Sequence, residues 1–250
     1  MNKKGLLLCA KYSVAPNYFG YCGPDENRSL IDHLKEQVAD REVQSILSEF
    51  DTLFLNLNLI AKENKIDDTF DERVVEAYWV GNALLQQVRS RDYAYLLDEK
   101  FKLERKLGKE TFGQLKHKVL QYVFYPHHSF HVFNIFKRTG TDPSFHTLHT
   151  MDACRIGWGK VIESQRSQVK SQTCFVVTRP LVILKNKLLF GDEITKEIIL
   201  HYKGKRFVQP VSGDWVSFHW SHICDILNPL QVKSLQFYTQ KAIDFYNCPQ

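Results

Sequence analysis

The spacing of hydrophobic residues changes partway along this 250-residue chain, and the change limits the folds open to it. In the first half, apolar residues such as Leu30, Leu34 and Val38 recur every third or fourth position, which is typical of amphipathic helices. After Cys154 they form short runs separated by Lys-Asn, Gly-Asp and Ser-Gly-Asp turns, which is typical of short strands. The sequence therefore predicts an α+β protein with about four or five helices before the strands.

The chain is predicted to end in one more helix, which begins at Pro229. Asn228 provides an N-cap, and proline suits the first position of a helix because its fixed φ is already helical. We therefore expect two domains. Residues 1–145 form a mainly helical domain, and residues 150–250 form a small β-barrel together with the C-terminal helix.

The composition is that of an ordinary globular protein, with 44% hydrophobic and 24% charged residues. No long stretch is apolar throughout, and the apolar run at the N-terminus is too short for a signal peptide, so we expect a cytoplasmic protein without membrane contact. The net charge is +5, but the basic residues are spread along the chain and alternate with acidic ones. This pattern indicates solvated helix surfaces and predicts no nucleic-acid partner.

The absence of several motifs argues against other common classes of protein. Its six cysteines are scattered without a Cys-x-x-Cys pair, which argues against a disulfide scaffold and against a structural zinc site. It contains no Gly-x-Ser-x-Gly motif, no phosphate loop and no dinucleotide fingerprint. None of the commoner enzyme classes is therefore predicted.

Two segments of the β region carry residues that can bind a metal. Cys154 stands just before a predicted strand that opens with two glycines, and His219 ends a strand that begins after a Ser-Gly-Asp turn. A small antiparallel barrel can bring the ends of two such strands together. A thiolate beside an imidazole would then form a ligand pair for iron or another soft metal. The alternative is that both residues are structural.

These two segments resemble the two signatures of the HypC/HupF/HybG family of NiFe-hydrogenase maturation chaperones. The first signature is Met-Cys, a short apolar segment, Pro-Gly and Lys/Arg-Val-Val-Glu, and the matching residues are Cys154, Gly159, Lys160, Val161 and Glu163. The second is Gly-Asp-Tyr/Trp-Val-x-Val-His with an acidic step and a C-terminal helix, and the matching residues are Gly213, Asp214, Trp215, Val216, His219, Asp225 and Leu227.

The resemblance implies a HypC-like barrel of the OB type and a role in hydrogenase maturation. In that family the cysteine and the histidine hold an Fe(CN)2CO fragment together with a partner protein. Cys154 and His219 are thereby implied as iron ligands, and a maturation protein or the hydrogenase large subunit as partner. The chain departs from the family in three ways: Cys154 is internal, Trp158 replaces a proline, and the segment 165–210 is longer.

Four further residues are secondary candidates. Cys22 lies in a loop between glycines that let a ligand approach the backbone, although a tight turn explains the glycines equally well. His127 and His131 would share a face on either a strand or a helix, where two imidazoles can bind one ion or form a polar rim. Arg155 would lower the pKa of Cys154 if the two side chains converge.

Two other functions stay open at this point. The helical half could make or modify an iron ligand as a metal-dependent enzyme. The chain could also be an interaction module whose barrel binds no metal.

Overall fold

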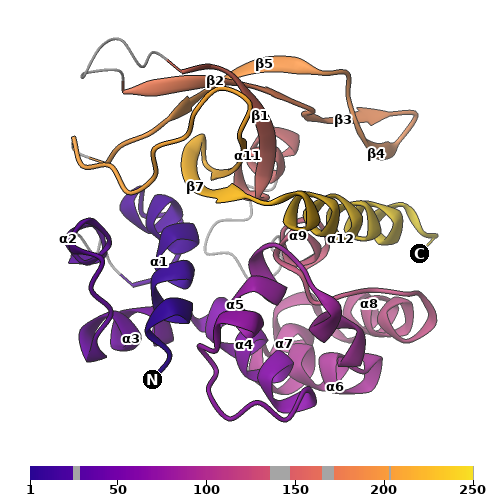
Figure 1. Cartoon of the computed structure of the whole chain (residues 1–250). Coiled ribbons are helices and arrows are strands. Elements are labelled where there is room, and N and C mark those ends of the chain that lie inside the picture. Colours follow the sequence, from indigo (N-terminus) through magenta and orange to yellow (C-terminus); the bar gives the residue numbers. More distant parts are fainter. Residues whose placement is uncertain (25–28, 136–146, 165–171, 203, 250) are drawn as a thin grey trace.

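The computed structural model describes residues 1–24, 29–135, 147–164, 172–202 and 204–249. Helices fill the N-terminal region, a five-stranded mixed sheet follows, and a long helix ends the chain. This order confirms the predicted α+β class. Figure 1 shows the sheet at one end of the molecule and most helices at the other, with the C-terminal helix between them.

The helical region consists of many short segments. Polar side chains start several of them: Asp40, Asp71 and Asn82 each accept a hydrogen bond from a backbone N–H of the turn that follows. This is why the helices are shorter and more numerous than predicted. The segments are α1 (Lys3–Tyr18), α2 (Ser29–Glu36), α3 (Arg41–Ser48), α4 (Asp51–Glu63), α5 (Glu72–Trp79), η1 (Ala83–Gln87), α6 (Ser90–Tyr95), η2 (Leu96–Lys100), α7 (Leu103–Leu107) and α8 (Lys109–Gln121).

The aromatic segment after Pro126 is helical. It forms α9 (His128–Phe130) and continues as one π-helical turn, η3 (His131–Ile135). The helix α11 (Leu148–Cys154) then leads into the sheet. The predicted domain boundary between 145 and 150 falls partly on residues outside the described part of the chain, and it stays a prediction.

Five strands close into a ring in the order β1-β2-β5-β7-β6. The strands are β1 (Gly157–Ser164), β2 (Thr173–Thr178), β5 (Ile194–Ile199), β6 (Trp215–His219) and β7 (His222–Leu227). Neighbours are antiparallel except β5 and β7, which run parallel. The ring is therefore mixed, whereas the sequence predicted an antiparallel barrel. β3 (Leu181–Leu184) and β4 (Lys187–Phe190) form a separate hairpin.

The inside of the ring is a small hydrophobic core of its own, with Val176, Ile198 and Val216 at its centre. A larger core joins the helical region to the outside of the ring and to the last helix, α12 (Pro229–Asn247). As predicted, α12 begins at Pro229 with Asn228 as its N-cap. None of the helices in the described ranges is long and apolar enough to cross a membrane.

The first helix lies directly against the ring. The hydroxyl groups of Tyr12 and Ser217 form a buried hydrogen bond of 2.9 Å. Next to it, the ammonium group of Lys11 lies 3.0 Å from both carboxylate oxygens of Asp225. α1 thereby reaches β6 and β7 and brings the start of the chain to the strand that carries His219.

Candidate metal centre

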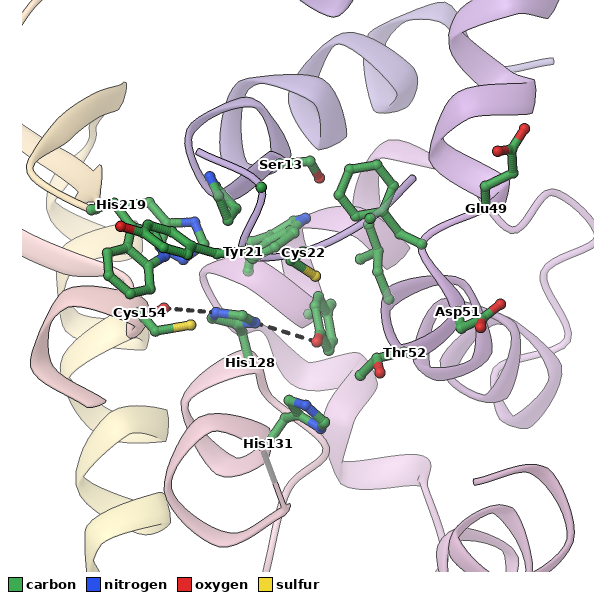
Figure 2. Close-up of a pocket in the computed structure, with 18 residues that line it drawn as sticks. Ser13, Tyr21, Cys22, Glu49, Asp51, Thr52, His128, His131, Cys154 and His219 are labelled. Atoms are coloured by element: carbon green, nitrogen blue, oxygen red, sulfur yellow. Dashed lines mark hydrogen bonds between the residues drawn. The ribbon is translucent and has the colours of Figure 1, made fainter. Parts of the chain in front are cut away.

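Three potential metal ligands gather where the ring meets the helices. His128, Cys154 and His219 each offer one ligand atom, and these atoms all lie within 4.8 Å of one another. Each residue is at most 8% exposed. Figure 2 shows the three side chains at one end of a pocket, and they come from α9, α11 and β6. One thiol and two imidazoles form a donor set that suits transition metals.

The end of α11 is fixed against the ring, and this places Cys154. Thr147 and Thr150 form a capping box that sets the start of the helix. At the other end, the backbone N–H of Trp220 donates to the carbonyl oxygen of Ala153 at 2.9 Å. The residue next to the thiol is therefore tied to the residue next to His219.

A strained turn places His219. Trp220 and Ser221 connect β6 to β7 and both have a positive φ, 51° and 59°. The left-handed conformation costs about 1–2 kcal/mol for each residue with a side chain, and Asn-Gly is the usual choice in a two-residue hairpin turn. The turn keeps His219 at the last position of the strand, opposite His222.

One nitrogen of His219 is left for a ligand. Its Nδ1 lies 2.8 Å from the carbonyl oxygen of Tyr12 and must carry the proton, because a carbonyl only accepts. That carbonyl has no helical partner, since the residue four positions on is Pro16, which lacks an N–H. Nε2 therefore bears the lone pair, and this buried atom has no hydrogen-bond partner in the described structure.

This arrangement is typical of metal-binding histidines. Such residues donate one ring N–H to a backbone carbonyl or a carboxylate, which fixes the tautomer and aims the other nitrogen at the ion. A buried acceptor without a partner is costly, and natural structures contain few of them. An ion at Nε2 of His219 would remove that cost.

His128 has a partner on each side of its ring. Its Nε2 donates to the carbonyl oxygen of Cys154 at 2.9 Å, and its Nδ1 accepts from the hydroxyl of Tyr78 at 3.3 Å. Its ring centroid lies 5.2 Å from that of His219 and 4.5 Å from that of Trp79. Metal binding requires one of the two nitrogens to exchange its hydrogen bond for the ion.

Burial keeps all three groups neutral in the absence of a cation. It raises the pKa of the Cys154 thiol well above its usual range, and the nearby thiol of Cys22 raises it further. Burial also lowers the pKa of His219 to about 4 and that of His128 well below its usual value. The thiol is therefore a poor nucleophile on its own. A cation that replaces its proton makes the buried thiolate favourable.

The pocket beside the three ligands has a volume of about 260 Å³. Aromatic rings form much of its wall, including Tyr78, Trp79 and Trp220, and the exposed acidic residues Glu49 and Asp51 also line it. In Figure 2 these two carboxylates lie on the opposite side from His219. A metal held by three protein ligands would therefore have an open position next to a small cavity.

Four of the residues singled out in the sequence line this pocket: Cys22, His131, Cys154 and His219. Cys154 and His219 meet as the sequence predicted, and Cys22 lies in the same pocket. Of the first signature, the side chain of Glu163 lies outside the described part of the chain.

His127 and Arg155 lie elsewhere. His127 precedes α9 with an extended backbone, so the four-residue helical spacing to His131 does not apply, and its ring stacks on Tyr238. The guanidinium of Arg155 donates to Asp152 at 2.9 Å and to the carbonyl of Arg179 at 2.7 Å. It does not converge with the thiol, and the pKa of Cys154 is raised rather than lowered.

Sequence reasoning missed His128 as a potential ligand. The cluster contains His127, His128 and His131, and which of them share a face depends on where the helix begins. With His127 as N-cap, His128 and His131 lie three residues apart on one face, and both line the pocket. The His-His-Ser sequence offered this cue, because a residue that caps a helix does not lie on its face.

Comparison with known proteins gives one result. No curated protein and no solved structure matches the chain. The family model that does match is not that of the HypC chaperones, and it spans both the helical region and the ring. With residues 1–249 matched, the chain belongs to a family described as a family of unknown function, DUF6390.

Proposed function

We propose that this protein is a metal carrier that holds a transition-metal ion with His128, Cys154 and His219. One observation carries the proposal: the unpartnered Nε2 of His219 lies in a buried group with a thiol and a second imidazole. The ring of His219 is already held in the tautomer that a ligand needs, by its bond to Tyr12.

Iron is the metal we propose. Imidazole nitrogen suits iron, copper, nickel and zinc alike, so the donor set alone does not select one of them. The choice of iron rests on the resemblance of the segments around Cys154 and His219 to the HypC signatures. We infer that the chain serves in NiFe-hydrogenase maturation, where it scaffolds or transfers an Fe(CN)2CO-type fragment.

The size and position of the pocket fit this role. Three protein ligands leave coordination positions free, and a cavity of about 260 Å³ beside them has room for small ligands on the metal. The partner we propose is a maturation protein or the hydrogenase large subunit. In the HypC family the cysteine stands at the free N-terminus, whereas Cys154 is buried at the end of α11. Transfer from this chain therefore requires the pocket to open.

The pocket also favours a second candidate, a metal-dependent enzyme that makes or modifies an iron ligand. An open metal position beside a small, mainly aromatic cavity is a common plan for a catalytic site. Turnover of a small molecule by the isolated protein would support the enzyme, and a stoichiometric effect on hydrogenase assembly would support the carrier.

Purification without oxygen, followed by metal analysis and infrared spectroscopy, tests the proposal. We expect about one iron per chain, with bands in the cyanide and carbonyl stretching region when hydrogenase maturation proteins are co-expressed. Cys154→Ala should lose both signals. Cys174→Ala is the matched control, because it removes another buried cysteine that lies inside the ring and lines no part of the pocket.

Three results are informative. Iron with infrared bands supports the hydrogenase role. A different metal that depends on Cys154 supports the metal centre and rejects that role. A protein that takes up no metal on its own or on reconstitution rejects the carrier.

A further inference from the structure

A second cysteine faces the candidate metal centre from the other side of the pocket. Cys22 follows α1 in an exposed loop, and its side chain belongs to the pocket wall together with His128, Cys154 and His219. Figure 2 shows Cys22 in the pocket, with His128 and Cys154 close by. Its thiol is close enough to Cys154 to raise the pKa of that residue.

Hydrogen bonds hold the backbone of the Cys22 loop. The buried amide of Asn17 donates to the carbonyl oxygens of Cys22 and Pro24, at 3.2 and 2.7 Å. The carbonyl oxygen of Pro16 accepts from the backbone N–H groups of Tyr21 and Cys22, at 2.8 and 3.3 Å. The backbone position of Cys22 is thus part of the fold.

Two aromatic contacts hold the same loop against the centre. Tyr21 stacks on Trp220 with 4.2 Å between ring centroids, so the loop is tied to the turn that carries His219. Gly23 has a φ of 89°, and a Cβ at this position would lie 2.4 Å from the ring of Phe50. A glycine is therefore needed for the loop to lie this close to Phe50, the residue before α4.

We propose that Cys22 is the fourth ligand of the metal and the one that exchanges during transfer. This inference rests on the proposed metal centre. His128, Cys154 and His219 are buried in elements with defined hydrogen bonds, whereas Cys22 is exposed. Its sulfur lies outside the group of atoms within 4.8 Å of one another, so the side chain of Cys22 has to turn toward the other three ligands when an ion binds.

The completed site has two thiolates and two imidazoles. On an ion that carries no small ligands of its own, this set favours tetrahedral coordination. The free positions that an Fe(CN)2CO-type fragment needs exist only while Cys22 is dissociated. Two negative thiolates in one pocket are unfavourable without a cation, because like charges repel, and Cys22 raises the pKa of Cys154. A divalent cation compensates the two negative charges and makes the pair of thiolates favourable. When Cys22 dissociates, an acceptor's ligand can take its position from the exposed side, and the other three ligands stay in place.

Titration of the full chain with cobalt(II), without oxygen, tests the inference. Thiolate ligands give cobalt(II) charge-transfer absorption in the near ultraviolet, and tetrahedral sites give intense visible bands. The wild type is expected to show both at one cobalt per chain. Cys22→Ala should still bind one cobalt, with about half of the thiolate absorption, as one of two soft ligands is lost.

The affinity gives a second readout. Loss of a ligand should cost at least as much as loss of an outer-shell partner, so cobalt binding by Cys22→Ala should be weaker by roughly ten-fold or more. Cys248→Ala is the control for a cysteine that lines no part of the pocket, and its titration should match the wild type.

The outcomes separate the two proposals. If Cys22→Ala and the wild type give the same spectrum and affinity, Cys22 is not a ligand and the three-residue centre stands. If the wild type binds no cobalt, the metal centre and the fourth ligand are rejected together. If Cys22→Ala binds none, Cys22 is a permanent ligand and the exchange role is rejected.

Discussion

The backbone carbonyl of Tyr12 accepts a hydrogen bond from Nδ1 of His219 at 2.8 Å, and a proline makes this bond possible. In a regular helix the carbonyl of Tyr12 would accept from the N–H of residue 16, but that residue is Pro16. The N-terminal helix therefore determines which nitrogen of a distant histidine faces the candidate centre.

Pro16→Ala tests this relationship. An alanine supplies the missing N–H, which competes with His219 for the carbonyl of Tyr12. We expect the helix content to stay the same while cobalt affinity falls roughly ten-fold, as for loss of other outer-shell partners. Nitrogen-15 NMR of the histidine rings should show the Nδ1–H tautomer of His219 in the wild type and a mixture in the variant. An unchanged tautomer and affinity would contradict the assignment.

Replacement of the neighbouring residues His127 and His128 should affect metal occupancy differently. His128→Gln is expected to lower metal occupancy strongly, because it removes a ligand. His127→Gln should keep full occupancy and lose about 1 kcal/mol of stability, since Nδ1 of His127 accepts the first N–H bond of α9. Metal analysis and thermal unfolding of both variants check the pair. Loss of metal in His127→Gln alone would place the site elsewhere.

Metal binding should release protons. At pH 7 the thiols are protonated, since burial raises the pKa of Cys154 above its usual range. The residue Cys22 is exposed as a whole, but its sulfur lies in the pocket wall, where the surrounding groups shield it from water and raise its pKa to about 11. Both histidines are neutral, since burial lowers their pKa values. We expect about two protons released per cobalt in the wild type and about one in Cys22→Ala, with affinity rising with pH. A weakly buffered titration with an indicator dye measures this number.

The metal-free protein should lose stability in acid. The unfolded chain binds a proton at each histidine near pH 6.5, whereas folded His219 binds one only near pH 4. Because the unfolded state holds more protons between these values, stability falls as the pH drops from about 6.5 to 4. Urea unfolding at several pH values should show this fall, and His219→Gln should show less of it.

The stacking of Tyr21 on Trp220 should control how fast the metal leaves. Tyr21→Ala removes the aromatic contact that ties the Cys22 loop to the β6-β7 turn. We expect faster transfer of cobalt to an external chelator, while Tyr21→Phe keeps the ring and the wild-type rate. Stopped-flow absorbance follows the transfer. Equal rates in all three proteins would show that this contact does not limit release.

The motifs at the ends of helices and strands could be recognised from the sequence. Cys154 ends a helix just before a glycine-containing strand, and His219 ends a strand at a turn, so their neighbours could be recognised without knowing the fold. The α+β class and the start of α12 at Pro229 followed from periodicity and capping in the same way. These features depend on residues that are close in sequence.

Features that depend on contacts between residues far apart in the sequence could not be predicted. Whether His127 or His128 faces the centre depends on the first residue of α9, and the distance of Cys22 from Cys154 depends on how α1 docks on the ring. Neither leaves a local pattern. The parallel pairing of β5 with β7 is likewise a matter of topology, since both strands look alike in sequence whichever way they pair.

The contact of α1 with β6 determines when, during synthesis of the chain, the candidate centre can form. Tyr12 is made 207 residues before His219, and the ring nitrogen of His219 has its orientation only when both are in place. A growing chain on the ribosome exposes the helices first and cannot form the centre until β6 has emerged. A metal bound at the proposed centre could therefore be loaded only after β6 has left the ribosome. A chain that is cut between Tyr12 and His219 could not form the centre, so metal would not be spent on such fragments.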